Sequence, residues 1–331
     1  MGSQRPGSRG RLPRSRREGP EPLVGWLVVR AFVTGSHGFV GNWLCRHLRA
    51  SGDEVITAPA GLEITDADAV RQIVTEARPD AVYHLAAFTH VGKSWTAPRE
   101  VMRVNVLGTL EVLEAARLCE PAPSVLLVGS AEVYGVVKPD QLPLTEDAPL
   151  LPVTPYATSK VAAEFLGLQA HLGRGLPVIR VRAFNHVGPG QGESFVVSAL
   201  ARRIVMAQQT GSATLAVGNL SPRRDFTDVR DVVRAYRLLI ERGQPGEVYN
   251  VCSGTDVAIG TLAQRLLDLA GARLELVSDP ELERPVDVPV LRGDPSRLRA
   301  ATGWEPGISL DETLRSVLDA WRENLAEGES S

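Results

Sequence analysis

Three glycines spaced three residues apart follow an apolar run near the beginning of the chain. The run, Leu27–Thr34 (LVVRAFVT), is rich in β-branched residues and predicts a buried strand. Gly35 permits a tight turn, Gly38 lets a pyrophosphate approach the N–H groups of a helix N-terminus, and Gly41 lets that helix pack closely on the strand. A glycine cluster alone marks ordinary turns, but this strand–turn–helix context predicts a dinucleotide-binding loop.

Strand and helix patterns alternate along the first half of the chain. Strands are expected at Leu27–Thr34, Glu54–Ala58, Asp80–Ala87, Ser124–Val128 and Pro177–Arg182. Helices are expected at Phe39–Leu48, from the N-cap Asp66 to Ala77, at Glu100–Leu118 and at Pro155–Leu172. This alternation predicts parallel βαβ units, and hence an α/β fold built on a doubly wound, parallel Rossmann sheet.

After about Ala183 the alternation loosens, and a smaller C-terminal α/β lobe is expected. This later part of the chain contains predicted helices at Phe195–Gln209, Asp228–Arg242, Ile259–Ala270 and Leu310–Asn324. A chain of 331 residues has room for about two domains. We assign residues 26–183, with parts of 228–255, to the dinucleotide-binding domain, and residues 184–227 and 256–325 to a substrate-binding lobe.

The first 25 residues differ from the rest of the chain. Six arginines and almost nothing apolar lie within residues 1–20. A disordered arginine-rich tail is therefore expected, because so little apolar surface cannot offset the entropy of ordering the segment. A basic docking arm and a start codon placed too far upstream are the alternatives.

Charge and cysteine content exclude several functional classes. The chain has 36 basic and 39 acidic residues, a formal net charge of -3, so neither a nucleic acid nor a membrane is an expected partner. No apolar run reaches the roughly 18 residues that span a bilayer. Cys45, Cys119 and Cys252 form no CxxC pair, so no disulfide framework and no metal site are expected, and a reducing, cytoplasmic location is predicted.

Tyr156 and Lys160 stand four residues apart on a predicted helix, so their side chains share one face. We expect the ammonium group to lower the phenol pKa from about 10 toward the working pH. Tyr156 could then exchange a proton with a carbonyl or alcohol oxygen during hydride transfer. With five tyrosines and three lysines, a chance YxxxK is expected only about 0.05 times. An exposed ion pair is the alternative.

A family resemblance follows from these motifs. Thr34–Gly41 reads TGSHGFVG, and Ser130 follows a predicted strand; with Tyr156 and Lys160 they resemble the extended short-chain dehydrogenase/reductase family. The resemblance implies Ser130, Tyr156 and Lys160 as a catalytic triad, and NAD or NADP as cofactor. It implies a cofactor-binding set of Gly35, His37, Gly38, Phe39, Val40, Gly41, Glu63, Ile64, Leu85, Ala86, Ala87, Asn105, Val128, Tyr156 and Lys160. Neither an acid nor an arginine stands at residues 58–59, so the choice between NAD and NADP stays open.

Downstream motifs narrow the resemblance to the sugar-nucleotide branch of that family. FNHVGPG (184–190), RRDFTDVRD (223–231) and ERPVDVP (283–289) are similar first to GDP-4-keto-6-deoxy-mannose reductases and next to GDP-mannose 4,6-dehydratases. This implies a nucleotide-sugar substrate, most closely a GDP-sugar, held by Thr89, Ser130, Glu132, Asn185, Arg224, Arg284 and Asp287. The family usually has glutamate where Asp287 stands. The resemblance also implies a homodimer, because proteins of this family usually pair through the two helices that correspond to residues 100–118 and 155–172.

Two activities remain open on these motifs. A reductase would use NAD(P)H to reduce a nucleotide-activated 4-keto-6-deoxyhexose, most closely GDP-4-keto-6-deoxy-D-mannose. A dehydratase or 4-epimerase would retain its cofactor through the cycle. Glu132 is implied as a catalytic residue and could remove the C5 proton in a dehydratase, yet similar reductases also carry a glutamate there. A catalytically silent protein on this fold is the third alternative, and the intact triad argues against it.

Overall fold

Six parallel strands form the central sheet, in the order β2-β1-β3-β4-β5-β9. They are β1 (Arg30–Thr34), β2 (Glu54–Thr57), β3 (Ala81–His84), β4 (Ser124–Val128), β5 (Val178–Ala183) and β9 (Val248–Val251). The five expected strands and the doubly wound α/β fold are confirmed. Strand β3 ends earlier than expected, at His84, and β9 was not among the expected strands.

The computed structural model describes residues 28–282 and 288–328. The tail expected at residues 1–25 lies outside the described residues, as do the expected substrate residues Arg284 and Asp287.

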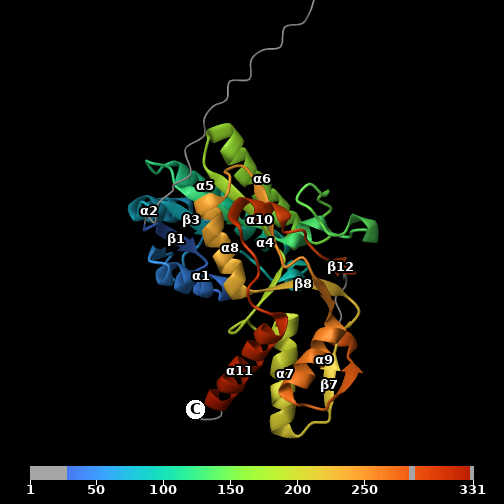
Figure 1. Ribbon diagram of the computed structural model, residues 1–331. Coiled ribbons are helices and arrows are strands. Elements are labelled where there is room, and N and C mark those ends of the chain that lie inside the picture. Colours follow the sequence, from blue (N-terminus) through green and yellow to red (C-terminus); the bar gives the residue numbers. More distant parts are fainter. Residues whose placement is uncertain (1–27, 283–287, 329–331) are drawn as a thin grey trace, which may run out of the picture.

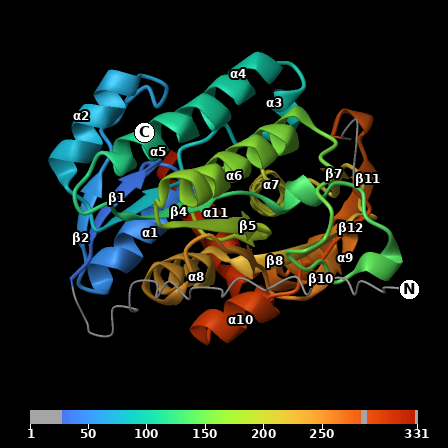
Figure 2. The same cartoon turned by 90° about the horizontal axis from the view of Figure 1, so that it is seen from above.

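Helices cover both faces of the sheet (Figure 2). One layer consists of α1 (Phe39–Ala50), α8 (Val229–Arg242) and α10 (Ser296–Thr302), and the other of α2 (Ala67–Ala77), α5 (Gly108–Arg117) and α6 (Pro155–Arg174). Successive side chains of β1 serve the two layers in turn: Ala31 and Val33 pack with the first core cluster, and Phe32 packs with the second. Both faces of the sheet are therefore buried, as a parallel sheet requires.

The single helix expected at Glu100–Leu118 is three segments in the structure. These are α4 (Pro98–Met102), a π-helical turn η1 (Arg103–Leu107) and α5. The extra residue of a π-helical turn shifts the side chains that follow it. Asn105, inside η1, is thereby buried against neighbouring segments, and its carbonyl accepts a 2.6 Å hydrogen bond from the Thr109 hydroxyl. Helical periodicity gave no signal of this interruption.

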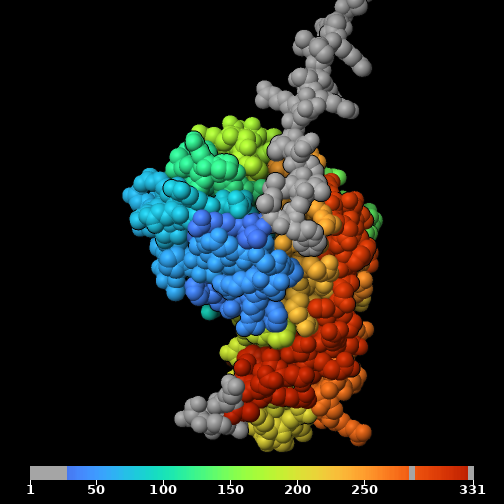
Figure 3. Space-filling view, turned by 60° about the vertical axis from the view of Figure 1, so that its left-hand side comes forward, coloured from blue at the N-terminus to red at the C-terminus, as the bar shows by residue number. Residues whose placement is uncertain are grey.

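The second half of the chain adds a lobe beneath the carboxyl end of the sheet (Figure 1). Helices α7 (Val196–Thr210), α9 (Ile259–Ala270) and α11 (Leu310–Gly328) pack together there around a core that includes Ile204, Leu262 and Leu318. A two-stranded sheet of β7 (Thr214–Val217) and β11 (Glu275–Ser278) lies beside them. In Figure 3 the C-terminal segments, in red, extend from the sheet layers down onto this lobe.

A small sheet connects the lobe to the main body. Its strands are β6 (Asn185–Val187), β8 (Arg223–Asp228), β10 (Asp256–Ala258) and β12 (Val290–Leu291). The remaining short elements are α3 (Val91–Ser94), η2 (Ala131–Tyr134), η3 (Pro139–Gln141) and η4 (Pro280–Leu282). Among the described residues, no helix combines the length and apolar character needed to cross a bilayer.

Candidate active site

The glycine loop between β1 and α1 has no room for side chains at Gly35 and Gly41, so a ligand could approach its backbone closely. Gly35 has φ +68°, and a Cβ placed on it would lie 2.7 Å from the Ala86 nitrogen. A Cβ on Gly41 would lie 2.1 Å from the Gly35 carbonyl oxygen. Gly38 is the N-cap of the twelve-residue helix α1 and provides no side-chain hydrogen bond to its first turn. The loop therefore fits a dinucleotide phosphate at the positive end of the helix.

Parallel register brings the end of β3 alongside this loop, where Thr34 pairs with His84. The Thr34 hydroxyl oxygen accepts hydrogen bonds from the nitrogens of Leu85 and Ala86, both at 3.2 Å. The same hydroxyl lies 2.8 Å from His84 Nδ1, and His84 Nε2 lies 3.1 Å from Thr109 Oγ1, so the buried ring is held between two hydroxyl groups. Three of the predicted cofactor residues, Leu85, Ala86 and Ala87, thus lie next to the glycine loop.

The four predicted catalytic residues meet at the carboxyl end of β4. Ser130, Tyr156 and Lys160 are each 8% exposed. The Ser130 hydroxyl lies close enough to the Tyr156 phenol to lower its pKa, and the Ser130 oxygen accepts a hydrogen bond from the Glu132 nitrogen at 3.2 Å. Lys160 Nζ donates to the Val128 carbonyl oxygen at 3.0 Å. Two segments that are separated in sequence therefore bring the predicted catalytic residues together at one site.

Burial controls the proton affinities of this group. It raises the pKa of Tyr156 to about 12, against the lowering effect of the Ser130 hydrogen bond, while the Glu132 charge raises the pKa further. It lowers the pKa of Lys160 to about 8. The expectation that Lys160 brings the phenol pKa down is thus not met in this structure, because loss of water around the phenolate outweighs the favourable contacts.

Asn105 ties the π-helical turn to the catalytic helix. Its Oδ1 accepts from the Phe88 nitrogen at 2.7 Å, and its Nδ2 donates to the Phe88 carbonyl at 3.1 Å and to Ser159 Oγ at 2.8 Å. Ser159 in turn donates to the Tyr156 carbonyl at 2.7 Å. Thr89, the next residue after Phe88, is exposed. Asn105 can therefore orient the predicted site residues through its hydrogen bonds to Phe88 and Ser159.

Glu63 and Ile64 follow β2 and lie against the π-helical turn. The Glu63 carboxylate is 3.3 Å from an Arg103 guanidinium nitrogen and accepts a 2.9 Å hydrogen bond from the Thr65 hydroxyl. Hydrogen bonds from these two partners lower the pKa of Glu63, which therefore stays ionised. Ile64 is buried, and a Cβ on Gly108 would lie 2.6 Å from its Cγ2. The pair forms the border of the candidate cofactor site on the β2 side.

A second group of predicted residues lines a cavity of about 240 Å³ in the lobe. Asn185 of β6 and Arg224 of β8 both border it, since these strands pair in parallel. The apolar part of the cavity wall includes Val217, Leu220 and Leu282. Sequence reasoning did not select most of the lining, which is Glu193, Ser194, Val196, Ala199, Leu200, Arg203, Val217, Gly218, Asn219, Leu220, Pro222, Ile259 and Leu282.

Comparison with known proteins decides the family. A family model described as GDP-mannose 4,6 dehydratase matches residues 58–317. A GDP-6-deoxy-D-mannose reductase of Pseudomonas aeruginosa is 39% identical over 304 residues, which cover 91% of this chain and all of the relative. The chain belongs to the GDP-mannose 4,6 dehydratase family. The expected membership of the extended short-chain dehydrogenase/reductases, NAD(P)-dependent oxidoreductases, is thereby confirmed.

Other members and solved structures place this dehydratase-family chain among several activities. A GDP-mannose 4,6-dehydratase of Yersinia enterocolitica is 27% identical, with 77% of this chain and 76% of the relative covered. The structure of Pseudomonas aeruginosa RMD complexed with NADPH is 40% identical with a TM-score of 0.83, covering 89% of this chain and 99% of that one. A Thermus thermophilus UDP-glucose 4-epimerase in complex with NAD is 28% identical with a TM-score of 0.79, covering 88% and 98%.

Proposed function

We propose that the protein is an NAD(P)H-dependent reductase that converts GDP-4-keto-6-deoxy-D-mannose to GDP-6-deoxy-D-mannose (GDP-D-rhamnose). The observation that carries the proposal is the grouping of Ser130, Tyr156 and Lys160, each 8% exposed, at the sheet edge that also carries the glycine loop. A buried acid beside a hydroxyl donor suits protonation of a carbonyl oxygen. The full-length match to a reductase of that name supports this choice of substrate.

In this proposal the chain's own residues handle the proton. Tyr156 gives its phenolic proton to the C4 oxygen of the sugar, and the Ser130 hydroxyl donates a hydrogen bond to that oxygen. Lys160, four residues further along α6, stabilises the resulting phenolate by its charge. Its pKa of about 8 keeps most of it protonated at neutral pH. Bound NAD(P)H supplies the hydride.

We further propose how the two parts of the chain divide the work. The domain of residues 26–183, with parts of 228–255, holds the cofactor through the glycine loop and the ends of β2 and β3. The lobe of residues 184–227 and 256–325 holds the nucleotide sugar in the 240 Å³ cavity that Asn185 and Arg224 border. Arginine suits the pyrophosphate because its guanidinium makes paired hydrogen bonds. Arg284 and Asp287 are proposed to contribute to the same site.

The second candidate activity is that of a GDP-mannose 4,6-dehydratase. The matching family model and the 27% identical dehydratases favour it, and so does the position of Glu132, close enough to Tyr156 for its charge to raise the phenol pKa. In a dehydratase, Glu132 would take the C5 proton. The two activities differ in their need for added reductant, and that difference provides the test.

The deciding assay uses two substrates. With GDP-4-keto-6-deoxy-D-mannose, we expect stoichiometric loss of the absorbance of NADPH or NADH and a product two hydrogens heavier by mass spectrometry. With GDP-mannose alone, we expect no keto sugar. Catalytic formation of the keto sugar would show that the protein is a dehydratase instead of a reductase.

Glu132→Gln should lower the reduction rate about tenfold, or about 1.4 kcal/mol. It should lower dehydration by on the order of a hundredfold or more, because the base is lost.

We also propose that the protein is a cytoplasmic homodimer. Helix α6 exposes Phe165 (52%) and Leu172 (75%), and the adjoining turn η1 exposes Leu107 (48%). An apolar groove beside them is lined by Pro98, Arg99, Met102, Arg103, Val106, Leu107 and Ala162. A second copy of the same face would cover these side chains.

The proposed cytoplasmic location is supported by the three cysteines, which are free thiols and suit a reducing compartment. Cell fractionation checks this location.

A further inference from the structure

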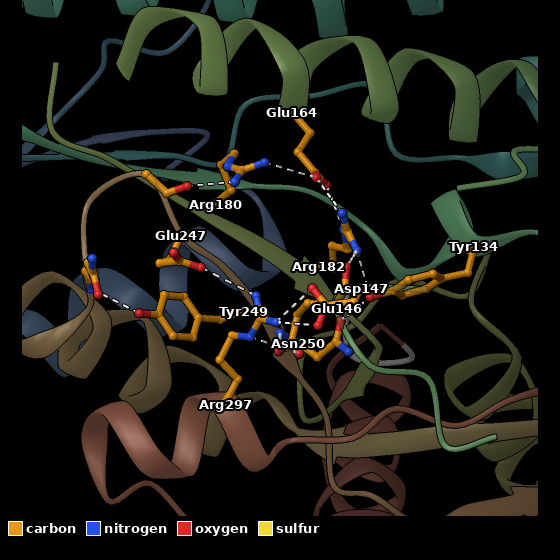
Figure 4. A network of polar contacts seen from close by, with 12 residues as sticks. Tyr134, Glu146, Asp147, Glu164, Arg180, Arg182, Glu247, Tyr249, Asn250 and Arg297 are labelled. Atoms are coloured by element: carbon orange, nitrogen blue, oxygen red, sulfur yellow. Dashed lines mark hydrogen bonds and ion pairs between the residues drawn. The ribbon is translucent and has the colours of Figure 1, made fainter. Parts of the chain in front are cut away.

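A buried ion pair joins the catalytic helix α6 to strand β5 (Figure 4). Arg182 of β5 donates from Nε to Glu164 Oε2 at 2.9 Å and from Nη2 to Glu164 Oε1 at 2.7 Å. Arg180 adds a longer contact from Nη1 to Oε1, at 3.4 Å. Glu164 is 3% exposed and Arg182 is 4% exposed. The two-pronged geometry holds Glu164 in one orientation on its helix.

The remaining guanidinium nitrogen of Arg182 reaches a different segment. Its Nη1 donates to the Tyr134 hydroxyl oxygen at 3.0 Å and to the Glu146 carbonyl at 2.8 Å. The guanidinium carbon also lies 5.0 Å from the centre of the Tyr134 ring. Tyr134 is fully buried, and its hydroxyl donates to Asn250 Oδ1 at 2.7 Å. Asn250 belongs to β9, so the hydroxyl is anchored to the main sheet.

The two ends of this network lie on the two catalytic segments. Glu164 follows Lys160 by four residues and Tyr156 by eight, which places all three on one face of α6. Tyr134 ends η2, the four-residue turn that follows Ser130 and contains Glu132. Arg182 therefore connects the helix carrying the phenol to the turn carrying its hydroxyl partner.

Neither stability nor substrate contact accounts for such a network. Moving two charged side chains out of water costs about as much free energy as their attraction in the interior regains. A well-packed pair of apolar side chains would therefore be at least as stable. Glu164, Arg182 and Tyr134 are too deeply buried to touch a substrate. The network instead fixes a distance between two elements. Arg182 can bond to both Glu164 and Tyr134 only when α6 and η2 keep their present spacing.

We propose that the Glu164–Arg182–Tyr134 network is a positioning unit that fixes the distance between the Ser130 and Tyr156 hydroxyls. The proposal rests on the proposed function for its kinetic consequence, since the Ser130–Tyr156 pair is the proton donor there. All three are positioning residues that act through Ser130 and Tyr156.

Tyr134→Phe tests the proposal with the smallest change. It removes the hydroxyl that links Arg182 to Asn250 and keeps the ring beneath the guanidinium. The matched control is Tyr249→Phe, which removes another buried tyrosine hydroxyl, one that accepts from the Gln244 nitrogen at 3.0 Å. Both variants should lose similar thermal stability. Only Tyr134→Phe should lower kcat, by about tenfold, with the KM values for cofactor and nucleotide sugar within about twofold of wild type.

A second measurement keeps this test independent of the reaction. Crystal structures of the two variants should show the Ser130 and Tyr156 hydroxyl oxygens further apart than in wild type in Tyr134→Phe, and at the wild-type distance in Tyr249→Phe. An unchanged distance between these two oxygens in Tyr134→Phe overturns the positioning role, and so does a kcat equal to that of the control. A wild type that fails to reduce the keto sugar overturns the proposed function alone, because the structural comparison still decides the network. Arg182→Lys should behave like Tyr134→Phe, since an ammonium lacks the fork that reaches both partners.

Discussion

Tyr156 lies in the first turn of α6, just after the N-cap Thr154, whose hydroxyl oxygen accepts from the Ala157 nitrogen at 3.0 Å. Tyr156→Phe removes only the transferable proton. We expect kcat to fall by about a thousandfold, or about 4 kcal/mol of barrier, while cofactor affinity stays unchanged. Steady-state kinetics and a cofactor titration check this. A rate within tenfold of wild type would show that another group donates the proton.

His84 makes stability depend on pH in the acid range. Burial, with a smaller contribution from the Lys160 charge, lowers its pKa from 6.5 to about 3. Between pH 6.5 and 3 the unfolded chain therefore binds more protons than the folded one at this site. The free energy of unfolding should fall as pH falls through this window, by up to about 1.4 kcal/mol per pH unit.

His84→Gln isolates that contribution, because glutamine does not titrate. Its absolute stability should be lower, since it replaces the ring bonded to Thr34 and Thr109. Urea unfolding of both proteins at pH 7, 6 and 5 should nevertheless show a flatter dependence on pH for the variant. Parallel pH profiles would mean that other groups account for the acid sensitivity.

At the scale of elements, the π-helical turn η1 is held by one side chain. Asn105→Ala would leave the backbone nitrogen and oxygen of Phe88 without their side-chain partner and would free Ser159 Oγ. We expect a loss of about 2 kcal/mol, or about 3 °C in Tm, together with a lower kcat. Asn219→Ala is the matched control for stability, because its hydrogen bonds to Ser221 are exposed. Equal melting temperatures in calorimetry would show that the turn does not depend on Asn105.

At the scale of the whole molecule, the exposed apolar side chains of η1 and α6 predict self-association. Wild-type protein should sediment as a dimer. The double variant Leu107→Glu/Phe165→Glu should sediment as a monomer, since charged groups would have to be desolvated at the interface. Val277→Glu, at a residue of β11 that is also exposed (44%), should remain dimeric. A wild-type monomer at micromolar concentration would rule out the proposed interface.

The local features of this protein could be predicted from its sequence. The glycine loop, the N-cap at Asp66, the helix at Ile259–Ala270 and the Tyr156–Lys160 pair all depend on residues close in sequence, whose spacing reports strand or helix geometry directly. Spacing also placed Ser130 at the end of a strand, and parallel strands bring such ends to one edge. The arrangement of the predicted catalytic group followed from these patterns.

Other features depended on partners distant in sequence, and only the tertiary structure decided them. The π-helical turn at Arg103–Leu107 forms where Asn105 meets Phe88 and Ser159, and periodicity carries no record of such contacts. The pKa of Tyr156 is raised because folding removes water from the phenol, an effect that sequence spacing cannot measure. The link from Glu164 through Arg182 to Tyr134 spans three elements and required their packing, since no pairwise spacing in the chain indicates which buried charges will meet.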